Sequence, residues 1–543
     1  MTTGRTAICL TLSARAVFAQ AAISPATLRT HLYAFAADSM MGREAGTAGN
    51  VKATDYLARE LRRIGLQPAG DDGAYFQTLP FKERAPATTS TLVINGERLA
   101  WRTGWVGFAQ TSAHREHLPV IYVGREGDSV SADLRARATG RLVLQRESRD
   151  PNAYDEWPDA AATALVVDDS VLDPPSLAEQ FVDDPMASRA RFAASPELIL
   201  TIAAVERAFG KSVDRLVPGD SGDATLDLVI DVRSSAFPAR NVVAILRGRD
   251  PTVANEYVAL GAHSDHIGVA KQPVDHDSLR IFNRIVRPRG IEDARIRATP
   301  AQIQTVTREL AAYRAAHPGT DRPDSIFNGA DDDGSGSVAL LAIAQHLASL
   351  RGNAAPRRSV LFVWHTAEEK GLLGSEYFVN HPAVPRDAIV AELTMDNVGR
   401  GGSGDQPAIT ATGGRIQGNP NFLMVVGSRR LSSELDSIIV RTNIGGRHGM
   451  QLDYSMDVAG HPARLFCRSD HAQYNRVGIP VAFFTTGANA DLHQVTDEPQ
   501  YIDYDHMARV ANYVDDVAER LANMDHRLVV DRPVPNPRSA CRQ

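Results

Sequence analysis

Five side chains of the kinds that bind transition metals are spread over the second half of the chain. In chain order they are His263, Asp332, Glu369, Asp396 and His493. Two imidazoles and three carboxylates make up the donor set that a pair of zinc ions needs to activate water for hydrolysis. Glu368 precedes one of these carboxylates and could serve as the general base that takes a proton from the water. Each residue lies near the end of a predicted strand or the start of a predicted helix.

The first motif, HSDH, places His263 and Asp265 at alternate positions. In an extended segment these two side chains face the same way. Asp265 could therefore orient the ring of His263, which is a common arrangement behind a metal-bound histidine. Taken alone, such a pair is more often part of a solvated loop.

The motif GADDDGSG contains three adjacent carboxylates, Asp331 to Asp333, which repel one another and favour a nearby cation. A calcium-binding EF-hand loop does not fit. With Gly334 as its invariant glycine, the loop would begin at Gly329 and end at Leu340, where acidic ligands are required. A plain acidic turn remains the alternative for this motif.

The other motifs are AEEKG, TMDNVG, DLHQVTDEP and SDHAQY. Two adjacent Glu residues are usually a solvated face, but Glu368 and Glu369 end a buried strand, where unpaired charge is costly. Singly, Asp396 could be a turn residue and His493 a surface residue. In the last motif, Asp470 and His471 could support the site or line the cleft. The coincidence of all the motifs in one domain carries the inference.

The elements that must position these residues are near-continuous apolar runs, which are typical of strands covered by helices on both sheet faces. The runs are 241–248, 257–263, 359–366, 388–396, 422–428 and 479–487. Residues 337–350 read as a helix between two of them. This alternation predicts an α/β domain of three layers, α/β/α, with a mixed and mostly parallel sheet. Ligands of such sheets gather at the carboxyl ends of the strands.

The chain is too long for one core, and changes along it in the pattern of apolar, polar and turn-forming residues predict five segments. They are a signal peptide (1–21), an N-terminal segment of the main domain (22–85), a β-rich insert (86–235), the main domain (236–535) and a tail (536–543). Within the second segment, residues 52–66 predict an amphipathic helix that ends at Gly65.

The stretch 269–327 lies between two of the candidate metal motifs and shows no strong strand. It contains one predicted helix, 300–317, with Thr299 as N-cap and Pro300 at the first position. We expect this stretch to wall or cover a substrate cleft. A solvated surface excursion is the alternative, and it requires the stretch to lie beyond a side chain's reach of the site.

Composition excludes some classes of function. The net charge is −7 and no basic run with interleaved aromatic residues is present, which argues against a nucleic-acid partner. No segment after the start is long and apolar enough to span a bilayer. The start itself has Arg5, an apolar stretch interrupted by Arg15, and a small-residue cleavage pattern at 19–21, which predicts export. A frayed amphipathic N-terminus is the alternative.

Three cysteines are present. Cys9 lies in the predicted signal, and Cys467 and Cys541 match no metal or redox spacing. A disulfide framework is therefore not expected, and the spacing leaves open whether Cys467 and Cys541 pair.

These motifs together resemble the co-catalytic dizinc aminopeptidase family, which includes secreted bacterial leucyl aminopeptidases, glutamate carboxypeptidase II, glutaminyl cyclases and the inert transferrin receptor. The likeness extends to the lead-in MMGREAGTAGNVKATDYLARELRRIGL. It also extends to the insert, which resembles a protease-associated domain in LPVIYVG, GRLVLQRES and DAAATALVVDDS.

The resemblance implies that His263 and Asp396 hold one zinc, that Glu369 and His493 hold the other, and that Asp332 bridges both. Asp332 matches the bridging position because it stands three residues before Ser335-Gly336. The resemblance further implies that Glu368 is the general base, that Asp265 orients His263, and that a cis peptide follows Asp332. Asp333 and Gly334 depart from the family's usual Asn and Ala, but no ligand is lost.

We therefore expect a metallo-aminopeptidase with two Zn²⁺ per chain and peptide substrates. Co²⁺ and Mn²⁺ would also suit the ligands. A carboxypeptidase-type or dipeptidase-type exopeptidase would need a cationic group for a free carboxylate, for which Arg400, Arg447 and Arg468 are candidates. A glutaminyl cyclase or a non-catalytic binding protein are further alternatives. Oligomeric state, side-chain preference, the oxyanion stabiliser and the role of the insert are not readable.

Overall fold

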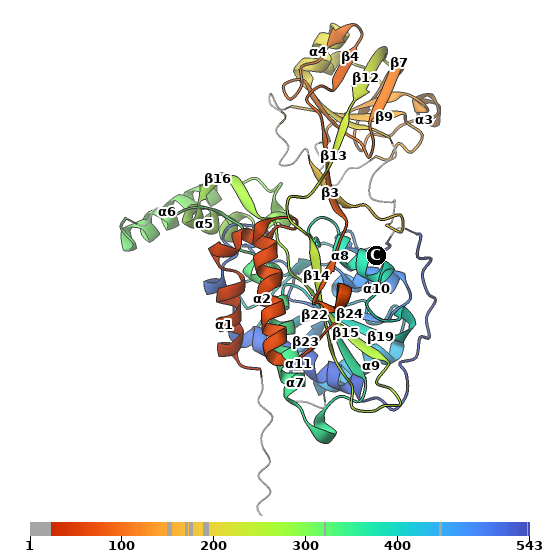
Figure 1. The fold of residues 1–543 in the computed structure, drawn as a ribbon. Helices are drawn as coiled ribbons and strands as arrows, with labels where there is room; N and C mark the ends of the chain where they lie inside the picture. The colour runs from red at the N-terminus through yellow and green to blue at the C-terminus, as the bar shows by residue number, and fades with distance from the viewer. Residues whose placement is uncertain are drawn as a thin grey trace, which may run out of the picture.

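A nine-stranded mixed sheet forms the centre of the main domain in this computed structural model (Figure 1). The structure describes residues 23–148, 155–168, 172, 178–187, 195–319, 322–444, 448–539 and 541–543. The predicted signal peptide, with Cys9, and Arg447 lie outside the described residues. The strands, in spatial order, are β1 (Gln67–Pro68), β14 (Arg240–Leu246), β18 (Ser359–His365), β15 (Tyr257–His263), β19 (Ile389–Met395), β24 (Val481–Thr485), β22 (Phe422–Val426) and β23 (Gln451–Asp453), and β2 (Phe76–Thr78) pairs with β14.

Parallel pairing is concentrated in the middle of this sheet. Strands β18, β15, β19 and β24 all run in the same direction, whereas β14 and β22 pair antiparallel on either side of them. The six apolar runs of the sequence are all strands, as predicted. The carboxyl ends of the four parallel strands therefore share one edge of the sheet.

Helices cover both faces of the sheet and complete the predicted three layers. One face carries α1 (Pro25–Phe35), α2 (Ala48–Ile64), α7 (Gly336–Ser349), α9 (Ser433–Ile444) and α11 (Tyr504–Ala522). The other face carries α8 (Leu373–Asn380) and α10 (His471–Arg476). Helix α2 buries Ala53, Tyr56, Leu57 and Leu61 and ends at Gly65, whose φ of 86° only glycine adopts readily. No described helix is long and apolar enough to cross a bilayer.

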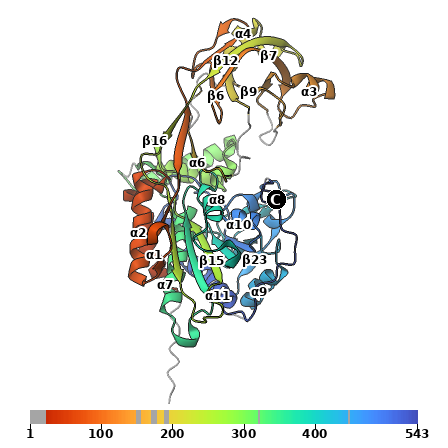
Figure 2. The same ribbon diagram turned by 45° about the vertical axis from the view of Figure 1, so that its right-hand side comes forward.

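The predicted β-rich insert has a sheet and a core of its own, and it stands away from the main sheet in both views (Figures 1 and 2). Its strands, in spatial order, are β5 (Glu97–Arg98), β4 (Thr91–Ile94), β12 (Ser221–Leu228), β7 (Ala113–Arg125), β8 (Leu142–Arg146), β9 (Ala162–Val167), β11 (Glu197–Thr201) and β6 (Trp105–Phe108). Its helices are α3 (Ala132–Ala138) and α4 (Ile202–Phe209). A small sheet of β10 (Glu179–Val182), β3 (Phe81–Pro86) and β13 (Ile230–Ser234) links it to the main domain.

The stretch 269–327 differs from its prediction. The predicted helix is present as α6 (Pro300–Ala316), and Thr299 caps it. A second helix, α5 (His276–Val286), and a two-stranded ladder of β16 (Val269–Asp275) and β17 (Pro323–Ile326) are also present. The statement that the stretch shows no strong strand was therefore incomplete. The ladder is largely exposed, so its sequence lacks the apolar alternation by which strands are predicted.

The tail after α11 runs along the outside of the main domain and returns to it at a disulfide between Cys467 and Cys541. The two cysteines are 74 residues apart in sequence and their Cα atoms are 5.7 Å apart. The spacing left this pairing open, and only the fold brings the two thiols together. A short ladder of β20 (Ala408–Ile409) and β21 (Arg415–Ile416) completes the described strands.

Candidate metal centre

All five predicted metal ligands come together at the carboxyl edge of the parallel strands. His263 is the last residue of β15, and Asp396 directly follows β19. Glu369 lies in the turn after β18, and His493 lies in the loop after β24. Asp332 lies in the irregular turn 330–335, just before α7. The sheet thus places side chains that are up to 230 residues apart in sequence at one site.

Asp332 lies between the two imidazoles, and its two carboxylate oxygens face different rings. Oδ1 is 3.1 Å from Nε2 of His263, whereas Oδ2 is 2.9 Å from Nε2 of His493. A second carboxylate approaches each ring: Asp396 Oδ1 lies 3.6 Å from His263 Nε2, and Glu369 Oε2 lies 3.2 Å from His493 Nε2. The donor atoms form two sets that share Asp332.

These separations fit a pair of zinc ions. Ligand atoms at ~2.0–2.1 Å from a tetrahedral zinc lie roughly 3.3 Å from one another, and the four distances scatter around that value. Nε2 of His263 is buried and has no hydrogen-bond partner among the described residues, although two carboxylates face it. Although burial alone would raise it, the nearby imidazoles of His263 and His493 hold the pKa of Asp332 well below its ordinary range.

The neighbouring acids of the run accept main-chain hydrogen bonds, whereas Asp332 faces both imidazoles. Asp333 also offers a ligand atom within 4.8 Å of those of His263 and Asp396. Asp331 accepts hydrogen bonds from the main-chain N–H of Gly399 and from the side-chain amide of Asn489. Asp333 accepts from the main-chain N–H groups of His263 and Gly336. The peptide bond between Asp332 and Asp333 is cis, as the resemblance implies.

Asp396 is held from two sides. The hydroxyl of Ser469 donates to Oδ2 at 2.7 Å, and the side-chain amide of Asn397 donates to Oδ1 at 2.8 Å. Ser469 belongs to the motif SDHAQY, so part of that motif supports the site. His471 does not, because its ring stacks on Phe483 in the core, where burial lowers its pKa to about 3.

His266 is a site residue that the sequence reasoning missed. Its Nδ1 lies 2.8 Å from Oε1 of Glu369, the oxygen that faces away from His493, and its ring meets that of His493 edge-on. With Asp332, Glu369 and His493 it offers ligand atoms within 4.8 Å of one another. The available signal was its place in HSDH, three residues after His263.

Glu368 and Asp265 lie beside the two donor sets. Burial raises the pKa of Glu368 well above its ordinary range, and nearby Glu369 and Asp396 raise it further although His263 opposes them. Asp265 differs in detail from its expected role. Nδ1 of His263 lies 3.1 Å from the main-chain carbonyl of Asp265 and 3.7 Å from its carboxylate. That carboxylate instead accepts the main-chain N–H of Glu368 at 3.1 Å.

Two further residues hold the acidic turn in place, and the sequence reasoning gave neither a role. Asp497 accepts the main-chain N–H groups of Asp331 and Asp332. Arg43, from the lead-in MMGREAG, is fully buried and donates to the carbonyls of Ser264, Asn328 and Gly329. Burial lowers the pKa of Arg43 to about 10, so the side chain remains a cation beneath the acidic residues.

The stretch 269–327 reaches the site, as expected for a wall of a cleft. Glu292, in the turn Gly290–Asp293, lies 2.5 Å from Nη2 of Arg468. Arg468 directly precedes Ser469, and its charge interacts with Glu368 and Asp396. Although burial opposes it, the cations Arg468 and Arg289 lower the pKa of Glu292, and His493 adds to this effect. The charges of this ion pair therefore act on residues of both donor sets.

The three arginines that were considered as binding groups for the free carboxylate of a substrate differ in their surroundings. Arg400 is buried and is paired with Asp491 and Asp405, so it is engaged away from any substrate. Arg447 lies outside the described residues. Arg468, whose side chain is 46% exposed, is the candidate that remains at the site.

Comparison with known proteins identifies the family. The profile of peptidase family M28 matches residues 241–518, just over half of the 543 residues. The chain belongs to this family of peptidases, which agrees with the predicted class.

Among curated relatives, leupeptin-inactivating enzyme 1 of Streptomyces exfoliatus is 31% identical over 169 residues, which are 31% of this chain and 31% of that protein. Leucine aminopeptidase 1 of Paracoccidioides brasiliensis (strain Pb03) is 29% identical over 196 residues, 34% of this chain and 44% of that protein. The chain thus spans less than half the length of these relatives.

Among solved structures, an aminopeptidase from Aneurinibacillus sp. strain AM-1 aligns with a TM-score of 0.50 at 16% identity, covering 94% of this chain and 97% of that chain. At this identity the likeness concerns the fold alone. It extends over nearly the whole chain, including the insert.

Proposed function

We propose that this M28 peptidase is a dizinc aminopeptidase that removes N-terminal residues from peptides. The observation that carries the proposal is the placement of Asp332, whose two oxygens face two imidazoles that are each flanked by a further carboxylate. A carboxylate shared in this way is suited to bridging two cations.

The chain's own residues define the two positions. His263 and Asp396 would hold one zinc, Glu369 and His493 would hold the other, and Asp332 would bridge them. Bound there, the ions would activate water at neutral pH and polarise the substrate carbonyl. His266 would fix the orientation of Glu369, and Ser469 that of Asp396, so both carboxylates would be positioned in advance.

Glu368 would move the proton. Its carboxylate takes one proton from the attacking water as the oxygen adds to the scissile carbonyl carbon. When the C–N bond breaks, Glu368 delivers that proton to the leaving amine, so the side chain ends the cycle as it began. Asp265 holds the main chain of Glu368 and thereby keeps the base beside the donor sets.

The relatives favour the aminopeptidase over its alternatives, since one is a leucine aminopeptidase and the solved structure of similar fold is an aminopeptidase. A carboxypeptidase-type exopeptidase is the second candidate because Arg468 lies at the site and could bind a free carboxylate. The full set of donors argues against an inert binding protein and against a one-zinc glutaminyl cyclase.

Hydrolysis of aminoacyl p-nitroanilides, N-blocked peptides and C-terminally amidated peptides, each with and without chelator, tests the proposal. We expect cleavage that requires a free α-amine, tolerates amidation and is abolished by chelator. Cleavage of N-blocked peptides that requires a free carboxylate would select the carboxypeptidase. Activity that survives complete metal removal would reject the metal mechanism.

We also propose that the protein is exported and that residues 86–235 are a protease-associated domain. The predicted signal at 1–21 supports export, and so does the disulfide, because such bonds persist in oxidising compartments. N-terminal sequencing of mature protein from the extracellular or periplasmic fraction tests the first statement. A mature chain that still begins at Met1 in the cytosol would contradict it.

A further inference from the structure

A large cavity lies between the main domain and the tail, next to the candidate metal centre but outside it. Its volume is about 1570 Å³. Its walls come from the turn 370–372, from α10 and the residues before it, from the linker residues 185–187 and from the tail. The disulfide cysteines Cys467 and Cys541 both line it, so the cross-link fastens the tail over the cavity.

The charges along this cavity have one sign. Six arginines of the described part of the chain line it: Arg386, Arg430, Arg464, Arg476, Arg538 and Arg542. Lys370 also lines the cavity, and it is paired with Glu44 at 2.7 Å. Among the described residues that line the cavity none is Asp or Glu, although the whole chain has 65 acidic residues and 58 basic ones. The positive lining is therefore a local feature that opposes the net charge of the protein.

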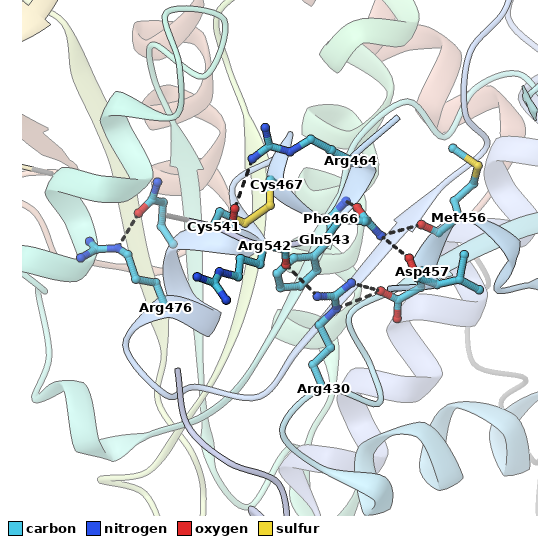
Figure 3. The surroundings of a disulfide bond; sticks show 12 residues. Arg430, Met456, Asp457, Arg464, Phe466, Cys467, Arg476, Cys541, Arg542 and Gln543 are labelled. Atoms are coloured by element: carbon cyan, nitrogen blue, oxygen red, sulfur yellow. Dashed lines mark hydrogen bonds and ion pairs between the residues drawn. A yellow bond between two sulfur atoms is a disulfide. The ribbon is translucent and has the colours of Figure 1, made fainter. Parts of the chain in front are cut away.

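Most of these guanidinium groups are held by neutral main-chain carbonyls, which orient a cation without cancelling its charge. Arg464 donates to the carbonyl of Cys541, Arg476 to that of Pro537 and Arg386 to that of Val379. Figure 3 shows Arg464, Arg476 and Arg542 grouped around the disulfide. Each guanidinium has five N–H donors, so further donors remain.

Two further observations describe the electrostatics. Arg430 has a carboxylate partner, Asp457, and also donates to the main-chain carbonyl of Arg542. Burial lowers the pKa of Arg476, and the charge of Arg386 lowers it further, although Glu376 at 4.0 Å opposes this. Arg386 and Arg476 therefore repel each other, and an anion placed between them would relieve the repulsion.

From this lining we infer that the cavity binds an oligoanion, a sugar that carries several sulfate or phosphate esters. Planar guanidinium groups bind tetrahedral oxyanions through paired hydrogen bonds. The cavity is larger than the roughly 300–1,000 Å³ typical of drug-sized ligands, so one small anion would contact only some of the arginines. Proline residues of the tail supply apolar surface for the sugar rings.

Isothermal titration of the full-length protein with sucrose octasulfate tests the inference for a soluble ligand. A second arm tests a membrane-borne source by co-sedimentation with phosphatidylcholine vesicles that contain or lack monophosphoryl lipid A. The informative variant is Arg538→Ala/Arg542→Ala, because both side chains are exposed and their removal leaves the fold intact. The matched control is Arg532→Ala/Arg441→Ala, which removes two exposed charges outside the cavity.

We expect binding at a ratio of one, roughly tenfold weaker in the cavity variant because two charge-assisted contacts are lost, and unchanged in the control. Sedimentation that depends on monophosphoryl lipid A and on the two arginines would place the anions on a membrane and support the same site. Two results would overturn the inference: no binding in either arm, or equal weakening by the cavity and control variants. The site is independent of the proposed peptidase activity, so Glu368→Gln should leave octasulfate binding unchanged.

Discussion

At the scale of single residues, one carboxylate connects the two halves of the centre. Asp332 faces both imidazoles, whereas Asp396 approaches His263 alone. Substitution of Asp332 should therefore lower the amount of bound metal more than substitution of Asp396.

We predict that Asp332→Asn lowers the zinc content from two ions per chain to less than one, whereas Asp396→Asn leaves about one, because only the bridging ligand serves both positions. Metal analysis of the purified proteins by plasma mass spectrometry measures this. If Asp332→Asn still carried two zinc ions, Asp332 would not be the bridge.

Adjacent glutamates should separate binding from proton transfer. We predict that Glu368→Gln retains both zinc ions and lowers kcat by about two orders of magnitude or more, since an amide cannot take a proton from water. The matched variant is Glu369→Gln, which should lose zinc because Glu369 faces His493. Steady-state kinetics with metal analysis distinguish them, and a normal kcat in Glu368→Gln would remove that residue from the role.

At the scale of secondary structure, loops after parallel strands supply the donors, and the stretch 269–327 borders them. This stretch is fastened to the loop after β24. Ile291 donates its main-chain N–H to the carbonyl of Leu492, and His276 lies 2.9 Å from Glu498. A side chain of the stretch can therefore act on the substrate without belonging to the metal centre.

Glu292 is a carboxylate of this stretch whose charge interacts with that of His493, and we expect it to attract the α-ammonium group of a substrate. Glu292→Gln should raise KM several-fold for free-amine substrates while zinc content and kcat change little. The reason is that the lost contact would bind the substrate equally strongly in the ground state and in the transition state. Glu309→Gln, on the exposed surface of α6, is the control. An unchanged KM would mean that Glu292 serves only to position Arg468.

The attachment of α5 should depend on pH. Burial lowers the pKa of His276, but contacts with Glu498 and Asp277 outweigh it and raise the pKa above 6.5. Because the pKa of His276 is higher in the folded state than in the unfolded state, protonated His276 stabilises the folded state. This stabilisation is fully present below the pKa of the unfolded state and is lost as pH rises through the pKa of the folded state. Amide exchange in α5, corrected for intrinsic rates, should therefore become faster as pH rises through that value. His276→Gln should abolish the trend, and an unchanged trend in that variant would contradict the assignment.

At the scale of the whole molecule, the tail is joined to the main domain by its disulfide and by the contacts of Gln543. The side-chain amide of Gln543 accepts a hydrogen bond from the main-chain N–H of Phe466 and donates one to the main-chain carbonyl of Met456 (Figure 3). The cross-linked segment includes Arg468 and Ser469, which lie at the candidate centre.

We predict that Cys541→Ser lowers the free energy of unfolding of the main domain by about 2–4 kcal/mol, because the disulfide restrains a long segment of the unfolded chain. Chemical denaturation followed by hydrogen exchange of main-domain amides measures it. Wild-type protein treated with reductant should match the variant, and equal stability of the oxidised protein and the variant would show that the disulfide contributes nothing.

Much of the main domain could be predicted from local sequence. Strands buried on both faces are near-continuous apolar runs, so β14, β15, β18, β19, β22 and β24 were all predicted. The donors at their ends followed, because parallel strands align their carboxyl ends. The ladder of β16 and β17 was not predicted, since exposed strands lack this pattern.

The supporting contacts could not be predicted, because they are contacts of the main chain. Arg43 holds carbonyl groups that are more than two hundred residues away, and a carbonyl has no signature in the sequence. Asp497 holds N–H groups in the same manner. His266 lay in a quoted motif, but its role depends on the direction in which the chain leaves β15.

Residue types and their order along the chain were enough to specify the class of chemistry and the layers of the fold, since ligand chemistry and hydrophobic periodicity are local properties. The three-dimensional arrangement decided the rest. It showed which of three adjacent acids faces both imidazoles, joined Cys467 to Cys541, and gathered six arginines around one cavity. Each of these depends on distances between segments far apart in sequence, and such distances are set by the packing of the whole chain.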